Sequence, residues 1–269
     1  MTFPYDGLPP ERTWREAVAG RAPGEVDPQV PGRFRIGRTT RVGSGGSCFA
    51  RRLSERLRRA GFAYLDVEPA LPWLSAEDRA AWNYGVYSAR YGDVFTSLQL
   101  LQMLERALGL RASTEDAWEA PGGFVDPYRP LVQPDPFGSV EELRSARESH
   151  LAAVRRLFET VEVFVFTLGL TEAWTAADGT ALPLCPGKRF GTFDPERYRF
   201  RNLTVAENVA ALESFLALLA RINPGARVLL TVSPVPLVAT MEDRHVLAST
   251  TYSKSVLRVA AEEVRQRHA

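Results

Sequence analysis

Hydrophobic positions recur at three- and four-residue spacing in several segments, which is the pattern of helices that bury one face. The first such segment begins at Ser47, directly after the small residues "GSGG", and ends at Gly61. Similar stripes predict further helices over 75–84, from Val94 to Leu108, from Ser139 to Val161, from Thr204 to Asn223, and from Tyr252 to the chain end. Ser139 with Glu142, and Thr204 with Glu207, have the spacing of capping boxes, which favours helix starts at these two points.

Continuous apolar runs predict strands between these helices. The runs "VEVFVFTLG" (161–169) and "ARVLLTVSP" (226–234) are typical of strands buried on both faces. Shorter segments, 39–46 and 62–69, predict two more strands, and Asp178-Gly179 predicts a hairpin. The alternation predicts an α/β fold, a three-layer α/β/α sandwich with a mainly parallel sheet. A doubly wound unit normally continues into one more strand, so the pattern predicts a sheet that lacks its last strand.

Two segments fall outside this alternation. Residues 1–38 are rich in Pro, Gly and Arg without periodicity and predict an extended N-terminal arm, followed by one domain over 39–269. Residues 110–138 contain five prolines and a glycine pair, and a loop of this length is more often functional than idle. Its aromatic side chains would form either a lid or a satellite core; they are Trp118, Phe124, Tyr128 and Phe137.

The composition of the chain argues against several classes of function. The net charge of +1 gives no reason to expect nucleic-acid or anionic-membrane binding, and no apolar run approaches the roughly 18 residues of a membrane span. No secretory signal is visible at the N-terminus, so we expect a soluble, cytoplasmic protein. The two cysteines lack zinc-ligand spacing and no dinucleotide or Walker fingerprint is present, so we expect neither a metal nor a cofactor.

Three loops after predicted strands carry unusual residues: "GGSCFA", "GLTEAW" (169–174) and "SPVPLVATMEDRH" (233–245). In a parallel sheet the ligand crevice lies beyond the carboxyl ends of the strands, so we expect these loops to converge. Cys48 lies in the first turn of its helix, where free N–H groups and the helix dipole stabilise a thiolate and can hold an oxyanion. The alternative is that Cys48 is a small buried hydrophobe and that the glycines only form a tight turn.

The chain has three histidines, of which His245 is the best candidate for a general base because it follows a strand end in a polar turn. A surface-loop histidine is the alternative for His245, whereas His150 is expected to be a packing residue of its helix. Glu172 could orient a base or bind a substrate hydroxyl, or could simply start a helix. Gly92 could allow backbone to approach the crevice closely, or could form a turn before a helix.

The chain resembles the GSCFA family, beginning with Gly46-Ser47-Cys48-Phe49-Ala50. The resemblance spans residues 41–260 in family order and includes "ARYGDVFTSLQLLQML", "FVDPYRP", "FVFTLGLTEAW", "TVSPVPLVATMEDRHVL" and "TYSKSVLR". This family is grouped with the SGNH/GDSL-like hydrolases, which implies a flavodoxin-like fold and chemistry of ester hydrolysis or acyl transfer on lipids or acetylated sugars.

The resemblance also suggests roles for individual residues. Cys48 stands where the hydrolases have their nucleophilic serine, preceded by Ser47, and Gly92 matches the glycine of their oxyanion hole. In the third hydrolase block, Gly-x-Asn-Asp, Thr171 replaces the asparagine donor and Glu172 follows it. The last block, Asp-x-x-His, should follow a later strand that this sequence does not reach. Either the sequence is a fragment, or His245 takes that role, or the site is not a hydrolase site.

The resulting hypothesis is an ester hydrolase or O-acyltransferase acting on an acylated sugar, lipid or similar small ester. Cys48 would attack, His245 and Glu172 would assist, and Ser47, Gly92 and Thr171 would bind the oxyanion or substrate. A non-catalytic module that binds a carbohydrate or acyl carrier is the first alternative. A structural protein in which the motif only packs is the second.

Overall fold

The computed structural model describes residues 3–28 and 32–268 and divides the chain into two units, Met1–Ile36 and Gly37–Ala269. The first unit contains the short helices η1 (Pro10–Arg12), η2 (Arg15–Ala19) and η3 (Pro23–Glu25). The sequence predicted an extended arm here, whereas the described residues of this unit form three short helical turns. Proline stands at the start of η1 and of η3, where its fixed φ favours a helical turn, and none of the three buries a residue.

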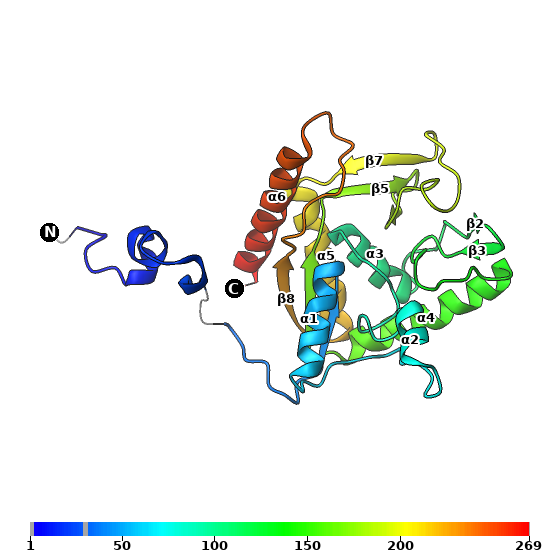
Figure 1. Ribbon diagram of the computed structural model, residues 1–269, viewed down its shortest axis with the longest axis horizontal. Coiled ribbons are helices and arrows are strands. Elements are labelled where there is room, and N and C mark those ends of the chain that lie inside the picture. Colours follow the sequence, from blue (N-terminus) through cyan, green and yellow to red (C-terminus); the bar gives the residue numbers. More distant parts are fainter. Residues whose placement is uncertain (1–2, 29–31, 269) are drawn as a thin grey trace. The chain divides into compact units, whose positions relative to one another are not determined.

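The second unit is built on a parallel sheet of three strands, β1 (Val42–Gly45), β4 (Val163–Leu168) and β8 (Arg227–Val232), in the order β1-β4-β8. Every residue of β1 and β4 is buried, as predicted from the continuous apolar run in β4. All three strands point their carboxyl ends to the same edge, which confirms the predicted mixed α/β fold with a parallel sheet (Figure 1).

Helices flank this sheet (Figure 1). Phe164 and Phe166 of β4 enter the main core, where Phe164 packs against Phe158 and Phe215. Helix α1 packs against β1 and β4, and Figure 1 shows it in front of the sheet while α5 lies behind. The helices are α1 (Cys48–Arg59), α2 (Ala76–Ala81), α3 (Ser97–Ala107), α4 (Val140–Thr160), α5 (Val205–Ile222) and α6 (Val246–Arg267).

The predicted strand at 62–69 is wrong except at one position. Tyr64 forms a single parallel bridge to Val42, and the pairing goes no further. The next backbone donor of β1, the N–H of Ser44, instead donates to the hydroxyl of Ser88. A side chain thus takes the place of the neighbouring strand and ends the ladder.

Other findings concern short strands outside the parallel sheet. The long loop 110–138 contains a hairpin, β2 (Trp118–Ala120) and β3 (Gly123–Val125), and Trp118 joins a second, smaller core with Val125, Leu182 and Tyr198. The predicted hairpin at Asp178 exists as β5 (Glu172–Ala176) and β6 (Ala181–Leu182), and β5 also pairs with β7 (Tyr198–Asn202). Thus Glu172 starts a strand and not a helix.

Two helices begin at other residues than predicted, one later and one earlier. Helix α3 begins later than predicted, because Thr96 and Gln99 form its capping box and Val94 lies in the preceding loop. Helix α6 begins before Tyr252, at Val246, and its first turns show no apolar stripe because residues such as Leu247 face solvent.

Candidate functional site

Cys48 is the first residue of α1, directly after the carboxyl end of β1, and it is exposed. The turn that places it requires Gly46, whose φ is +139° and where a Cβ would lie 2.9 Å from the Cβ of Thr167. Ser47 is the N-cap residue, but its side chain does not cap the helix. No side chain of the described residues therefore accepts from the N–H groups in the first turn of α1. These N–H groups lie close to the thiol and could donate to a bound anion.

Backbone hydrogen bonds join the segments around Cys48. The carbonyl of Gly46 accepts from the N–H of Val94 at 2.8 Å, and the carbonyl of Phe95 accepts from the N–H groups of Gly169 and Leu170. The N–H of Ser233, at the end of β8, donates to Leu168 at 2.9 Å. The loops after β1, β4 and β8 therefore meet at one edge, as the sequence predicted. We call this edge, defined by residues 46–48, 93–95 and 169–171, the crevice, only because it lies at the carboxyl ends of the parallel strands.

Helix α6 adds a cation to the crevice. The Nζ of Lys254 donates to the carbonyl of Gly169 at 2.6 Å, and the hydroxyl of the preceding Ser253 accepts from the N–H of Thr171 at 3.1 Å. Burial lowers the pKa of Lys254, and the nearby Cys48 thiolate opposes this shift. Lys254 thus lies close enough to Cys48 for the two side chains to interact electrostatically. Sequence reasoning missed it, although its lysine is one of only two in the chain.

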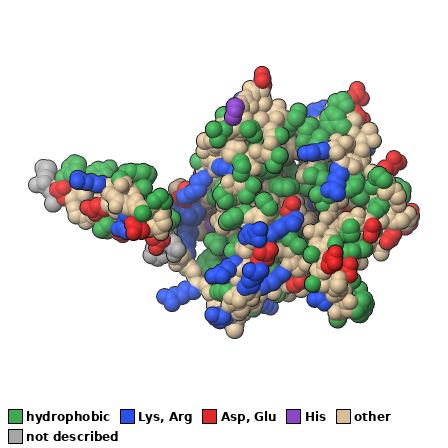
Figure 2. Space-filling model, viewed as in Figure 1, with side chains coloured by type: hydrophobic (Ala, Val, Ile, Leu, Met, Phe, Trp, Pro, Cys, Tyr) green, Lys and Arg blue, Asp and Glu red, His purple; other side chains and the backbone are tan. Residues whose placement is uncertain are grey.

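Helix α1 itself is strongly basic, and Figure 2 shows Lys and Arg side chains gathered over it. Arg51, within one turn of Cys48, forms an ion pair with Asp93 at 3.3 Å and lies over the ring of Tyr87. Asp93 also accepts a hydrogen bond from the hydroxyl of Tyr87 at 2.6 Å. The Asp93 carboxylate is therefore engaged by Arg51 and Tyr87.

The remaining predicted binding residues occupy different positions. Ser47 is buried beside Gly169, where a Cβ would lie 3.5 Å from the Ser47 hydroxyl. Thr171 is buried, and its hydroxyl has no hydrogen-bond partner among the described residues. Gly92 has a φ of +68°, which allows the turn just before Asp93, and it lies next to Arg129.

His245 and Glu172 do not join Cys48 in a triad. His245 is the N-cap of α6, and its Nδ1 accepts from the N–H of Leu247 at 3.1 Å. Glu172 accepts from the hydroxyl of Thr240 at 2.6 Å and from the N–H of Met241 at 3.4 Å. The carboxylate thus holds the loop before α6, and no hydrogen bond joins either side chain to Cys48 within the described ranges.

Cys185 lies elsewhere, in the segment after β6, where its thiol donates to the carbonyl of Pro186. Burial raises the pKa of Cys185, which disfavours its thiolate. The two cysteines of the chain are therefore a natural pair for comparison, one exposed at a helix start and one partly buried.

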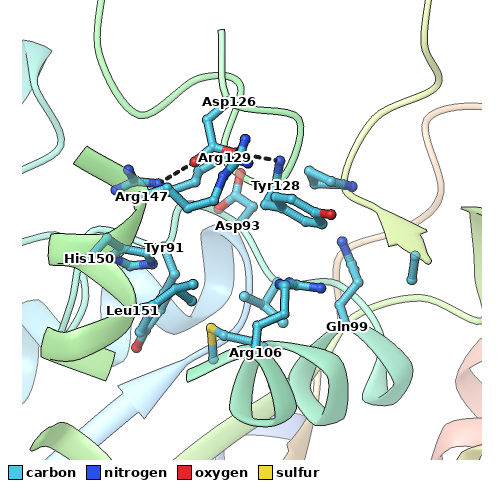
Figure 3. Close-up of a pocket in the computed structure, with 14 residues that line it drawn as sticks. Tyr91, Asp93, Gln99, Arg106, Asp126, Tyr128, Arg129, Arg147, His150 and Leu151 are labelled. Atoms are coloured by element: carbon cyan, nitrogen blue, oxygen red, sulfur yellow. Dashed lines mark hydrogen bonds and ion pairs between the residues drawn. The ribbon is translucent and has the colours of Figure 1, made fainter. Parts of the chain in front are cut away.

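A second polar region adjoins the 92–94 segment, where Asp93 and Val94 line a cavity (Figure 3). At its centre Asp126 is buried and accepts from the Nε of Arg129 at 2.8 Å and from the Nη2 of Arg147 at 3.0 Å. Burial would raise the pKa of Asp126, but the charges of the two arginines outweigh it and hold the pKa below its ordinary range. We call Arg106, Asp126, Tyr128, Arg129 and Arg147 the arginine cluster.

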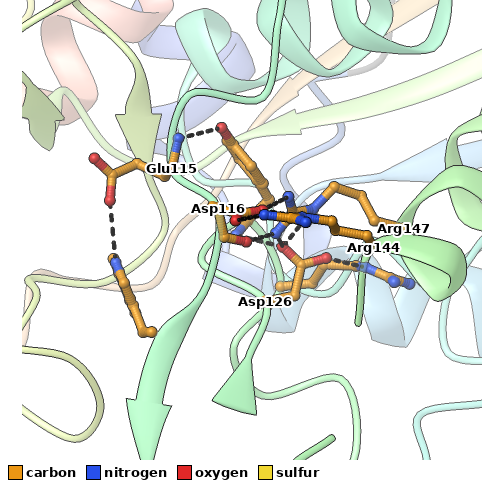
Figure 4. A network of polar contacts seen from close by, with 8 residues as sticks. Glu115, Asp116, Asp126, Arg144 and Arg147 are labelled. Carbon is orange, nitrogen blue, oxygen red and sulfur yellow. Dashed lines mark hydrogen bonds and ion pairs between the residues drawn. The ribbon is translucent and has the colours of Figure 1, made fainter. Parts of the chain in front are cut away.

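Further ion pairs extend from this cluster to the long loop, as Figure 4 shows. Asp116 contacts both Arg144 and Arg147. Glu115, also buried, accepts from Arg197 at 2.8 Å and from the hydroxyl of Tyr198 at 2.9 Å. These contacts hold the loop in place. Of the two alternatives for its aromatic side chains, a lid or a satellite core, the buried Trp118 belongs to a satellite core.

His150 borders the same cavity and is a packing residue, as expected from the sequence. Its Nδ1 lies 2.7 Å from a carboxylate oxygen of Glu68. Burial and then the charge of Arg129 lower the pKa of His150, so the neutral ring donates Nδ1–H to Glu68. Burial would raise the pKa of Glu68, but the hydrogen bond from His150 and the N–H of Arg90 hold it below its ordinary value.

No group of three or more His, Cys, Asp or Glu side chains is placed to hold a metal ion in residues 3–28 and 32–268. Over the same ranges, none of the helices combines the length and the apolar character needed to cross a bilayer.

Comparison with known proteins agrees with the motif at the start of α1. The family model described as "GSCFA family" matches residues 41–269, which covers the whole sheet, the crevice and the arginine cluster. No curated protein and no solved structure matches the chain. The match extends over most of the sequence, and the chain therefore belongs to the GSCFA family.

Proposed function

We propose that the protein is an SGNH-like ester hydrolase or O-acyltransferase that acts on an acylated sugar, lipid or similar small ester, with Cys48 as nucleophile. The observation that supports this most is the position of Cys48, exposed at the start of α1 with Lys254 beside it. A helix N-terminus and a neighbouring cation are two of the features that favour a reactive thiolate in proteins. The proposal assumes a reducing compartment such as the cytoplasm, where an exposed thiol stays reduced.

In the proposed reaction the Cys48 thiolate attacks the acyl carbonyl carbon, and the carbonyl π electrons move to the oxygen. The free N–H groups in the first turn of α1 donate to this oxyanion. Collapse expels the alcohol and leaves a thioester on Cys48. Water or an acceptor hydroxyl then attacks the thioester, which releases the acid or the new ester and restores the thiol.

Lys254 takes over in this proposal the role that the sequence suggested for His245. Its lowered pKa makes a neutral amine more accessible than for an exposed lysine, so it can accept the thiol proton. Once protonated, its ammonium group stabilises the thiolate and later returns the proton to the leaving alcohol. The hydrogen bond to the Gly169 carbonyl holds the amine in place.

One observation favours the alternative of a non-catalytic carbohydrate or acyl-carrier binding module. No imidazole or carboxylate hydrogen bonds to Cys48 among the residues that the structure describes. A site of this kind would keep the crevice and the helix N-terminus for ligand binding without turnover.

Hydrolysis of a panel of acyl esters separates these functions, and the chain supplies its own controls. Cys48→Ala should lower kcat/KM by about 100-fold or more, since it removes the nucleophile. Lys254→Met should lower it by about tenfold or more, since it removes the proton acceptor. Cys185→Ala and Lys188→Met remove the other cysteine and the other lysine and should change it by less than about twofold. Turnover that persists in Cys48→Ala would exclude the mechanism, and binding without turnover in the unmodified protein would favour the module.

A further inference from the structure

Arg106, near the end of α3, is a cation without a partner. It makes no hydrogen bond and no ion pair with any described residue, and its Nη1 is buried. The guanidinium lies over the ring of Tyr128, whose centroid is 4.0 Å from the guanidinium carbon. Burial lowers the pKa of Arg106 to about 10, which leaves the side chain charged at neutral pH. An arginine in this environment normally has an acceptor.

The charges around Arg106 do not neutralise it. Asp126 is taken up by Arg129 and Arg147, and Asp93 is taken up by Arg51 and Tyr87. Burial disfavours the charge of Arg106 most, Tyr128 and Asp126 favour it in part, and Arg111 and Arg147 disfavour it, so that its pKa stays below the ordinary value. The cavity beside the arginine cluster therefore carries an excess of positive charge.

Two further donors face the same cavity. The Oε1 of Gln99 accepts from the N–H groups of Phe95 and Thr96, which leaves its Nε2 as a free donor; in Figure 3 this side chain extends toward Tyr128. The hydroxyl of Tyr128 accepts from the N–H of Glu115, so its own hydrogen is available. Arg106, Gln99 and Tyr128 thus present donors on one cavity.

We propose that this cavity binds a small oxyanion group, a carboxylate or a phosphate, with Arg106 as its main ligand. A planar guanidinium holds two oxygens of such a group at once, and the amide and hydroxyl donors satisfy the others. The anion supplies the counter-charge that the surrounding side chains do not. The cavity volume of about 30 Å³ excludes a large ligand from the interior. This inference does not depend on the chemistry of Cys48.

The test is a thermal-unfolding titration of the full chain with inorganic phosphate, at constant ionic strength maintained with chloride. Sulfate, acetate and phenyl phosphate form the other arms and show whether a tetrahedral or a planar oxyanion, free or attached to a larger group, fits the site. We expect a saturable rise in Tm with at least one of these anions, with half-saturation at about 10 mM or below.

Arg106→Met should weaken the binding of that anion by about tenfold or more, because a charge-assisted pair is lost. In the absence of oxyanions its Tm should equal or exceed that of the unmodified protein, because the variant removes an unpaired cation from the interior. Arg52→Gln removes the same charge from an exposed position on α1 and should change affinity by less than about twofold. Cys48→Ala should bind as the unmodified protein does. Absence of saturation with every anion, or equal losses in Arg106→Met and Arg52→Gln, would overturn the proposal.

Discussion

The crevice at Cys48 and the cavity beside the arginine cluster share one short segment, residues 93–94, yet the two regions are built in opposite ways. The crevice is assembled from backbone: glycine turns, strand ends and main-chain hydrogen bonds place an exposed thiol and a lysine. The arginine cluster is assembled from side chains of α3, α4 and the long loop: Asp126, Arg129 and Arg147 are buried and paired with one another, and Arg106 has no acceptor among the described residues. Removal of one member of the Asp126–Arg129–Arg147 ion pairs should therefore cost stability, whereas removal of a side chain in the crevice should cost function.

The largest expected effect is on the cluster. Asp126→Ala leaves Arg129 and Arg147 buried without their shared carboxylate and should lower the free energy of unfolding by about 3–5 kcal/mol. Urea denaturation measures the loss. Cys48→Ala, in the exposed position, should change the same quantity by less than about 0.5 kcal/mol. Similar losses in both variants would break the comparison.

A smaller effect should show that the crevice depends on its backbone. Gly46→Ala introduces a Cβ at a φ of +139° and 2.9 Å from the Thr167 side chain, and should destabilise the fold by about 2–3 kcal/mol. Gly109→Ala is the matched control, since its φ is +70° but no atom lies within 4 Å of the added Cβ. Gly109→Ala should lower the free energy of unfolding only by the backbone cost of a positive φ for alanine, about 1 kcal/mol. Equal losses in the two glycine variants would show that close approach at Gly46 contributes nothing.

The smallest effect concerns pH. The folded pKa of His150 lies below its unfolded value of about 6.5, because of burial and the charge of Arg129. The unfolded state therefore takes up the proton first, and stability that is fully present above about pH 6.5 is lost as the pH falls toward the folded pKa. Charged groups near the ring are Glu68, Arg129 and Asp126.

His150→Gln should flatten this decline in the free energy of unfolding between about pH 6.5 and pH 5. His245→Gln, at an exposed helix start, should leave the decline in place. Urea denaturation at each pH measures both slopes. An unchanged slope in His150→Gln would show that His150 does not link stability to pH.

The two regions also differ in how far the sequence could predict them. The crevice follows from a contiguous motif and from strand order, because parallel strands bring their carboxyl ends to one edge. Cys48 and the converging loops were therefore predictable from sequence. The position of His245 relative to Cys48 could not be predicted, because its distance from a strand end says nothing about the direction in which the loop folds.

The arginine cluster left no such signal, because its members come from α3, α4 and the loop at 126–129, and each charge alone resembles a surface residue. Lys254 lay in a motif that the sequence resemblance already included, and the scarcity of lysine could have drawn attention to it. The strand at 62–69 failed for a related reason, since a single hydroxyl, that of Ser88, ended its pairing with β1. Tertiary contacts of this kind are not encoded in local periodicity.

The central claim, that Cys48 is an acyl-accepting nucleophile, is tested most directly by mass spectrometry of the protein after brief incubation with p-nitrophenyl acetate at neutral pH. The account predicts one added acetyl group on the peptide that contains Cys48, released by hydroxylamine, formed more slowly in Lys254→Met and absent in Cys48→Ala. Cys185, whose thiol pKa is raised by burial, should remain unmodified over the same period. Acetylation of Cys185 as fast as of Cys48, or no adduct on Cys48 in the intact protein, would contradict it.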